Sequence, residues 1–368
     1  MIYLDNAATS FPKPTQVRRS VAEAMIRYAN PGRSGHGPSM AAGKAVYQCR
    51  RVAGELFGCQ PEQVAFTGSC TQGLNTAIRT IVKPGARVLI SGFEHNAVVR
   101  PLYALGTDIR VAGRRLFDPV DTLEAFRREL ALGVDAAVFT HASNVFGYIL
   151  PIEQLSKLCR EAGVPFVIDA AQTAGSQPLS LEKTGADFIA MPGHKGLLGP
   201  QGTGILLCGR SPEPLLFGGT GSQSELLTMP EELPDRAEAG TLNVPGIVGL
   251  AAGMALVKKR GIGMAAKAER EAALVAINGL KSMGIPVFSG ENQGGTFSFL
   301  PPGDCEETGH RLWNMGIAVR AGLHCAPLAH RSAGTLKTGT VRVSFGPDCN
   351  ISQSRQLLHA MGRIVKKL

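Results

Sequence analysis

The sequence has little of what marks several common protein classes. Its 368 residues include one tryptophan and five tyrosines, so it lacks the aromatic side chains that interleave with basic residues on many nucleic-acid-binding surfaces. The formal net charge is +9, but lysine and arginine are scattered along the chain rather than clustered. We therefore expect a basic surface that attracts small anions, and no nucleic-acid partner. The alternative is a non-enzymatic α/β protein that binds nucleic acid or an acidic partner.

Several motifs are also missing. None of the eight cysteines forms a Cys-x-x-Cys pair, which argues against zinc ribbons and thioredoxin-type chemistry, and we expect no metal site. We expect no signal peptide, and the sequence contains no apolar run long enough to span a bilayer. We therefore expect no membrane partner and a reducing cytoplasm as the compartment. Neither a Walker loop nor an early Gly-x-Gly-x-x-Gly occurs, which weakens the alternative of a nicotinamide dehydrogenase.

What is present is an alternation of short apolar strands with amphipathic segments. The predicted strands are 64–67, 87–91, 136–140, 166–169, 188–191 and 204–208. Helix-like segments such as 151–162 lie between several of them. Strands that are apolar almost throughout are typical of a parallel sheet buried on both faces. The sequence therefore predicts an α/β fold with a mostly parallel sheet covered by helices.

The pattern changes after Pro245. The later segments are a long helical stretch interrupted at 261–263, a glycine-rich alternating run, a helix and a strand: 247–283, 294–299, 307–315 and 340–345. The chain is too long for a single core of ordinary size. We expect a large domain of residues 15–246 and a smaller α+β domain made of residues 1–14 plus 247–368.

Polar side chains follow five of the predicted strands, at the point where each strand ends. In chain order these groups are Gly68–Gly73, Glu94-His95, His141–Asn144, Asp169–Gln172 and His194-Lys195. Ligands of open α/β sheets gather at the carboxyl ends of the strands, so we expect these side chains to form one rim. This coincidence is the strongest indication of a functional site in the sequence.

The residue types on this rim suit one cofactor, pyridoxal 5'-phosphate (PLP). Lys195 lies between glycines beside an apolar strand, and its amine can form a Schiff base with an aldehyde. Asp169 ends an apolar strand and can balance a protonated ring nitrogen. The helix that follows Gly68–Gly73 begins with N–H groups suited to a phosphate, and His95 can stack on a ring. PLP requires these groups together.

A simpler interpretation exists for each group. Lys195 can be a surface lysine on a turn, and Asp169 can be a helix N-cap. Ser69 or Thr71 can likewise cap the helix that follows them. The joint pattern of the five strand ends favours the cofactor site over these separate explanations.

The order of motifs resembles that of a known family. Asp169–Gln172 followed by Gly193–Lys195 resembles the signature of class V aminotransferases, which are fold-type I PLP enzymes. Further segments are similar to those of cysteine desulfurases in that group: Tyr3–Thr9, Glu94-His95, Ser143-Asn144 and Glu238–Thr241. The resemblance covers about residues 2 to 350 and implies the seven-stranded type of sheet in the large domain.

The segment Arg320-Ala-Gly-Leu-His-Cys325-Ala-Pro bears on the substrate. It resembles the segment that carries the nucleophilic cysteine in desulfurases of the shorter-loop type. Arg342 lies in Val341–Phe345, which resembles the strand whose arginine binds the substrate carboxylate, a task that suits a guanidinium fork. Alternatively, Cys325 is a small hydrophobic residue in the core, and Arg342 is a charged residue on the surface of a strand.

The resemblance implies a PLP-dependent cysteine desulfurase that converts L-cysteine to L-alanine and a persulfide on Cys325. The sulfur would supply iron-sulfur clusters or another sulfur cofactor through an acceptor protein. The implied catalytic residues are Lys195, Cys325 and His95. The implied cofactor contacts are Cys70 (through its backbone), Thr71, His95, Asp169, Gln172, His194, Lys195 and, from the partner in a homodimer, Thr241. The implied substrate contacts are Asn144, Arg342, His36 and Arg320.

Two positions depart from the family pattern. Pro192 stands where a serine is usual, so phosphate binding would depend more on Thr71, His194 and Thr241. Leu323 replaces the first histidine of a His-His-Cys segment, which bears on substrate choice or persulfide handling. The alternative function is a selenocysteine lyase, or another class V lyase or transaminase, in which Cys325 is not catalytic.

Overall fold

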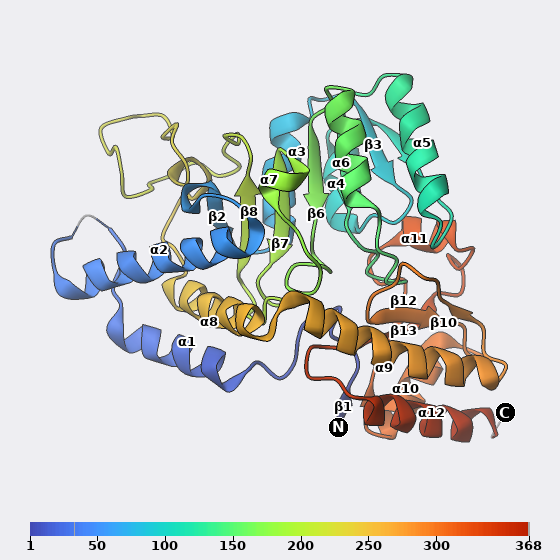
Figure 1. Ribbon diagram of the computed structural model, residues 1–368. Helices are drawn as coiled ribbons and strands as arrows, with labels where there is room; N and C mark the ends of the chain where they lie inside the picture. Colours follow the sequence, from blue (N-terminus) through green and yellow to red (C-terminus); the bar gives the residue numbers. More distant parts are fainter. Residues whose placement is uncertain (33, 367–368) are drawn as a thin grey trace.

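A computed structural model describes residues 1–32 and 34–366 (Figure 1). Its centre is a seven-stranded sheet with the strand order β2 (Val64–Thr67), β8 (Gly204–Cys208), β7 (Phe188–Pro192), β6 (Phe166–Asp169), β5 (Ala136–Thr140), β3 (Arg87–Ser91) and β4 (Asp108–Ala112). Only β8 runs antiparallel to its neighbours, and the remaining pairs are parallel. The predicted mostly parallel α/β sheet is confirmed.

Helices cover both faces of this sheet because successive strand residues alternate between two apolar clusters. Val138 packs with one cluster and Phe139 with the other. The helices of this larger part are α1 (Thr15–Arg27), α2 (Gly37–Phe57), α3 (Cys70–Ile81), α4 (Asn96–Ala104), α5 (Pro119–Ala131), α6 (Ile152–Glu161), α7 (Leu181–Thr184) and α8 (Val244–Arg260). The side chains of α3 and α4 contribute to one cluster, and those of α2 and α8 contribute to the other.

The six strands predicted before Pro245 agree with the structure, apart from β7, which extends one residue further to Pro192, and the strand predicted over 340–345 ends one residue earlier, at Ser344. The sequence interpretation missed β4, whose residues alternate between exposed and partly buried positions. This edge strand carries Asp108 and Arg110, so it lacks the apolar run by which the central strands were found. Polar edge strands are common because they discourage pairing with other chains.

A second sheet lies beside the first. Its strand order is β12 (Arg320–Gly322), β13 (Thr340–Ser344), β10 (Thr296–Phe299) and β9 (Val287–Phe288), all antiparallel. Around it lie α9 (Ile262–Ser282), α10 (Cys305–Asn314), α11 (Pro327–Ser332) and α12 (Ile351–Val365). The first strand, β1 (Ile2–Tyr3), pairs in parallel with β11 (Ile317–Ala318).

The helical stretch after Pro245 is interrupted as predicted, because α8 ends at Arg260 and Gly261 adopts a positive φ of 82° before α9. Ile247 and Leu250 of α8 pack in the core of the large sheet, whereas Leu4 packs in the core of the second sheet. The two domain boundaries stay a prediction.

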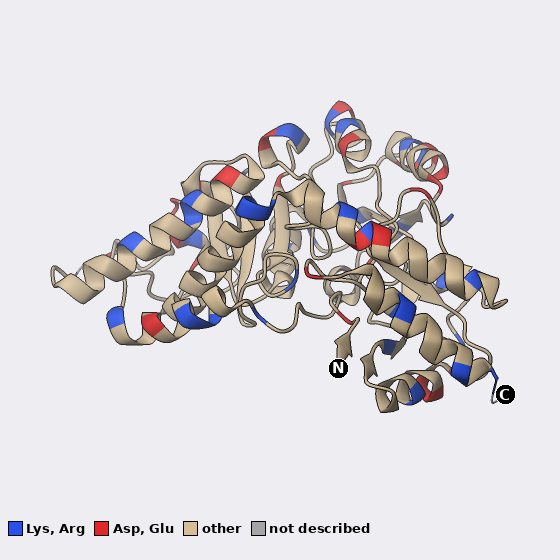
Figure 2. Cartoon of the chain, turned by 60° about the horizontal axis from the view of Figure 1, so that its bottom comes forward, with Lys and Arg blue, Asp and Glu red and all other residues tan. Residues whose placement is uncertain are grey.

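The basic residues are spread over the molecule (Figure 2). Figure 2 shows lysine and arginine distributed over several helices and mixed with acidic residues. Within residues 1–32 and 34–366, no helix combines the length and apolar character needed to cross a membrane. All eight cysteines are free thiols, and five of them are buried.

Candidate active site

Five strands of the large sheet end at one edge. Because β2, β3, β5, β6 and β7 run in the same direction, the residues that follow them meet there. They line a cleft with an empty volume of about 530 Å³. The structure brings eight of the predicted site residues together in this cleft: Cys70, Thr71, His95, Asn144, Asp169, Gln172, His194 and Lys195.

Asp169 is a buried carboxylate at the end of β6, and only 2% of its surface is exposed. Its Oδ1 accepts hydrogen bonds from the backbone N–H of Ala171, at 2.9 Å, and from the thiol of Cys70, at 3.6 Å. The described residues provide no ion-pair partner for it. A buried carboxylate is unfavourable without a cation, so the cleft suits a positively charged group in contact with Asp169.

Lys195 follows β7 on a turn that only glycines allow. A side chain at Gly193 would collide with Thr203, and one at Gly196 would collide with the backbone oxygen of Ala174. Lys195 is partly rather than fully buried. Burial lowers the pKa of its amine below the usual value, which favours the neutral, nucleophilic form.

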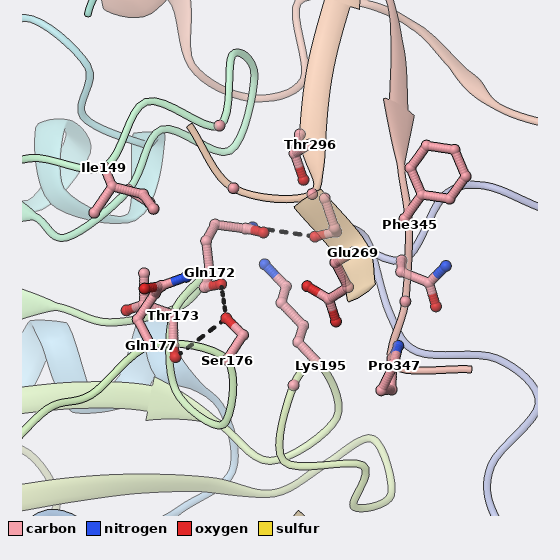
Figure 3. Close-up of a pocket in the computed structure, with 18 of the residues that line it drawn as sticks. Ile149, Gln172, Thr173, Ser176, Gln177, Lys195, Glu269, Thr296, Phe345 and Pro347 are labelled. Carbon is pink, nitrogen blue, oxygen red and sulfur yellow. Dashed lines mark hydrogen bonds between the residues drawn. The ribbon is translucent and has the colours of Figure 1, made fainter. Parts of the chain in front are cut away.

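A second pocket adjoins Lys195 on the side of the smaller sheet (Figure 3). It extends from Gln172 to Glu269 on α9 and Thr296 on β10. Burial raises the pKa of the Glu269 carboxyl to about 8. Lys195 therefore lies between this pocket and the cleft that contains Asp169.

Two helices begin at the cleft. The first residues of α3 are Cys70 and Thr71, and the hydroxyl of Ser69 caps the helix by accepting the N–H of Gln72. Backbone N–H groups at such a terminus can bind an anion. His95 caps α4 through its Nδ1, which accepts the N–H of Ala97 at 3.0 Å. Burial lowers the pKa of His95, so its ring stays neutral near pH 7.

The N-terminal segment fixes the turn that carries Lys195. The amine of Lys13 donates a 2.5 Å hydrogen bond to the backbone oxygen of His194, and the hydroxyls of Thr9 and Ser10 donate to the same oxygen. Burial lowers the pKa of Lys13 to about 8. Sequence reasoning missed these residues because their partner lies 181 to 185 positions away, which no local pattern can reveal.

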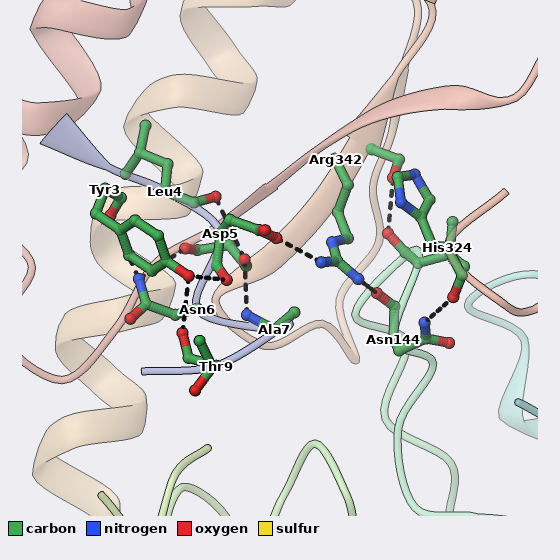
Figure 4. Close-up of polar contacts among 12 residues, drawn as sticks. Tyr3, Leu4, Asp5, Asn6, Ala7, Thr9, Asn144, His324 and Arg342 are labelled. Carbon is green, nitrogen blue, oxygen red and sulfur yellow. Dashed lines mark hydrogen bonds and ion pairs between the residues drawn. The ribbon is translucent and has the colours of Figure 1, made fainter. Parts of the chain in front are cut away.

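Arg342 does not line the cleft, and 2% of it is exposed. Its Nη2 donates to Oδ1 of Asp5 at 2.6 Å, and its Nη1 donates to the backbone oxygen of Asn144 at 2.9 Å (Figure 4). The amide of Asn144 in turn donates to the backbone oxygen of His324 at 2.7 Å. This network connects the N-terminal segment, the cleft and the turn that carries Cys325.

Cys325 is exposed on the turn between β12 and α11. Its backbone oxygen accepts the N–H of Asn96 at 2.8 Å, so the turn is fixed next to His95 at the edge of the cleft. The imidazole of His324 is buried, and its Nε2 lies 3.2 Å from the backbone oxygen of Thr340. Burial lowers the pKa of His324 to about 2, so this ring carries no charge that would stabilise a thiolate at Cys325.

Three predicted residues lie on the surface outside the cleft lining. His36 is exposed and caps α2 by accepting the N–H of Ser39. Arg320 is exposed on β12, where it pairs in register with Arg342. Thr241 is exposed in the segment before α8, close to Glu238, whose carboxylate forms a buried ion pair with Arg50 at 2.6 Å. The roles of all three stay predictions.

Comparison with known proteins identifies the family. The family model described as Aminotransferase class-V matches residues 2–356. A probable cysteine desulfurase of Pyrococcus abyssi is 33% identical over 393 residues, which cover 100% of this chain and 95% of the relative. A cysteine desulfurase of Escherichia coli O139:H28 is 31% identical, covering 89% of this chain and 84% of the relative.

Solved structures agree with this assignment. The apo cysteine desulfurase of Thermococcus onnurineus NA1 superposes with a TM-score of 0.93 at 30% identity, covering 100% of this chain and 95% of that one. The S-sulfonic acid form of the E. coli cysteine desulfurase CsdA gives a TM-score of 0.85 at 25% identity, with the same coverage. The chain therefore belongs to the class-V aminotransferase family, within its group of cysteine desulfurases.

Proposed function

We propose that this chain is a PLP-dependent cysteine desulfurase, which converts L-cysteine to L-alanine and retains the removed sulfur as a persulfide on Cys325. The observation that carries this proposal is the cleft itself. A partly buried lysine, a buried carboxylate with no ion-pair partner among the described residues and the start of a helix line one cavity. An exposed cysteine is held at its edge.

The residues of the cleft suit PLP. Lys195 would hold its aldehyde and Asp169 its ring nitrogen, and Gln172 would reach the ring hydroxyl. His95 would stack on the ring. The N–H groups and hydroxyl of Cys70 and Thr71 at the start of α3 would hold the phosphate together with His194, and Pro192 adds no donor. When bound, PLP supplies a sink for the electrons released at the α-carbon of the amino acid.

The protein's own side chains carry out the remaining tasks. Because burial favours its neutral form, Lys195 can take up a proton at Nζ and return it. Asn144 and Arg342 would bind the substrate carboxylate, with His36 and Arg320 contributing from the surface. The thiolate of Cys325 forms a new S–S bond to the sulfur of L-cysteine as the C–S bond of the substrate breaks. Since Cys325 is exposed, an acceptor protein can reach its persulfide.

We also propose a homodimer in which Thr241 of each subunit reaches the cofactor phosphate of the other. The exposed position of Thr241 outside its own cleft supports this arrangement. The Gly218–Ser222 loop lies beside it, because the N–H of Gly240 donates to the backbone oxygen of Gly219 at 2.8 Å. The cytoplasmic location stays a prediction.

The experiment is to incubate the purified holoenzyme with L-cysteine and to measure L-alanine and sulfide. Cys325→Ala should abolish both products and keep the visible absorption of the bound cofactor, whereas Lys195→Ala should remove that absorption. Cys59→Ala serves as the control because Cys59 is partly buried outside the cleft. Mass spectrometry should find one extra sulfur on Cys325 after brief exposure to cysteine.

The same experiment separates the alternative function. If Cys325→Ala forms alanine at the wild-type rate, Cys325 is not the sulfur carrier. A class V lyase or transaminase, including one that acts on selenocysteine, would then explain the cleft better.

A further inference from the structure

The guanidinium of Arg342 already has a carboxylate partner inside the protein. We propose that Asp5 sets the affinity of the substrate-carboxylate site by competing with the substrate for Arg342. This inference rests on the proposed function, in which Arg342 binds the carboxylate of the amino acid. It assigns a role in substrate affinity to a residue of the N-terminal segment.

The geometry of the ion pair leaves part of Arg342 available. Nη2 donates to Asp5 and Nη1 to the backbone of Asn144, while the buried Nε has no partner among the described residues. A guanidinium has five N–H donors and can bind a carboxylate through two of them. Arg342 therefore has donors left for a second carboxylate.

The charge on Arg342 is already balanced, however. Its side chain is 2% exposed and that of Asp5 is 19% exposed, so water screens the pair weakly. A substrate carboxylate that approaches Arg342 therefore meets an ion pair without net charge, and the carboxylate of Asp5 repels it. It must either share Arg342 with Asp5 or displace it, and both outcomes weaken binding.

The backbone of Asp5 is held independently of its side chain. Its neighbours are fixed to β13, because the N–H of Ala7 donates to the hydroxyl of Ser344 at 2.9 Å and the amide of Asn6 donates to the backbone oxygen of Ser344 at 3.1 Å. The hydroxyl of Tyr3 donates to the backbone oxygen of Asp5 at 3.1 Å (Figure 4). Asp5→Asn therefore removes the charge and keeps both the segment and an oxygen that can accept from Nη2.

The experiment compares an amine that has a carboxylate with an amine that has none. L-alanine and ethylamine are titrated into the holoenzyme, and the change in visible absorption gives a dissociation constant for each. In Asp5→Asn, L-alanine should bind about tenfold more tightly, the size of effect that one charge has on an ionisable neighbour within a few ångströms. The affinity for ethylamine, which has no carboxylate, should not change. Asp348→Asn is the matched control, because Asp348 pairs with Arg260 on the surface at 2.6 Å.

Unchanged or weaker binding of L-alanine to Asp5→Asn, with the wild-type preference for L-alanine over ethylamine intact, overturns the role of Asp5 and leaves the proposed function standing. A wild-type protein without that preference overturns the carboxylate role of Arg342 and with it the role of Asp5, whereas the test on Cys325 still decides the proposed function. Asp5→Ser, which is also neutral, must shift the dissociation constant of L-alanine in the same direction. It replaces Asp5→Asn in the test if thermal unfolding shows that the asparagine variant does not fold.

Discussion

Glu94 is a carboxyl group buried next to His95, at the end of β3. Its Oε1 accepts the N–H of Thr140 at 2.9 Å and is also bonded by the backbone and hydroxyl of Ser91. Its Oε2 has no partner among the described residues. Burial raises the pKa of Glu94 from 4.5 to about 8, so the folded protein keeps the proton that the unfolded chain loses.

This difference predicts how stability depends on pH. Above pH 4.5 the unfolded state binds fewer protons at Glu94 than the folded state, so the free energy of unfolding falls as the pH rises towards 8. Glu94→Gln removes this titration. Between pH 5.5 and 7.5, we expect the free energy of unfolding of the wild type to fall by roughly 2 kcal/mol relative to that of Glu94→Gln. Urea unfolding of both proteins at the two pH values measures this difference. Free energies of unfolding that change in parallel with pH would contradict the prediction.

Single residues also show what sequence reasoning can detect. Asp169 and Lys195 were predictable because a charge next to an apolar strand is conspicuous. Lys13 and Asp5 were not predictable. Lys13 matters through its contact with His194, and Asp5 matters through its contact with Arg342, and both partners lie far away in the sequence. A sequence shows the residue types at a site more readily than the partners that hold them.

At the scale of elements, the turn between β12 and α11 has an unusual backbone. His324 and Cys325 both adopt positive φ, at 50° and 57°, a region that non-glycine residues rarely occupy. The backbone oxygen of His324 accepts a hydrogen bond from the side-chain amide of Asn144, and that of Cys325 accepts one from the backbone N–H of Asn96, so the turn is held in place. Strain of this kind is typical of functional sites whose surroundings over-determine the conformation.

Glycine at this position should relieve the strain. We expect Cys325→Gly to be more stable than Cys325→Ala by about 1 kcal/mol, since a left-handed conformation disfavours a residue with a Cβ atom by that amount. Chemical denaturation of the two variants measures the difference. The corresponding pair at Cys159, inside α6, should show the opposite order because glycine destabilises a helix. A Cys325→Ala variant that is as stable as Cys325→Gly, or more stable, would show that the turn is not strained.

Elements were predictable to the extent that burial marks them. The central strands are buried along their whole length, so composition alone identified them. The edge strand β4 was not predicted because it is half exposed. The strands β1, β9 and β11 have two residues each, which is too short to show a periodicity. Their existence depends on pairing with segments distant in the sequence.

At the scale of the whole molecule, one end carries exposed apolar side chains. The segment between β8 and α8 projects from the same end as α1 and α2 (Figure 1). Phe217 and Leu227 of this segment are exposed, as is Ile26 of α1. We expect this end to be the surface through which two subunits associate, because association would cover these apolar groups, and Thr241 belongs to the same segment.

We expect the wild type to have twice the mass of one chain in solution and the double variant Phe217→Asp, Leu227→Asp to be monomeric. The monomer should also retain less PLP, because the proposed contribution of Thr241 of the partner subunit to the phosphate site would be lost. Light scattering and the cofactor absorption per subunit measure the two effects. Tyr103→Asp, at an exposed aromatic residue of α4, is the control. A double variant with an unchanged mass would rule out this surface.

The pairing of the first strand with a late one has a consequence for biosynthesis. Tyr3 leaves the ribosome long before Ala318, its neighbour in the sheet, and Asp5 precedes Arg342 by 337 positions. The strands that carry the cleft, from β2 to β7, are all translated in between. A growing polypeptide can therefore form the region around Lys195 before the residues that bury Leu4 have been translated, and the substrate-carboxylate site proposed at Arg342 is completed last.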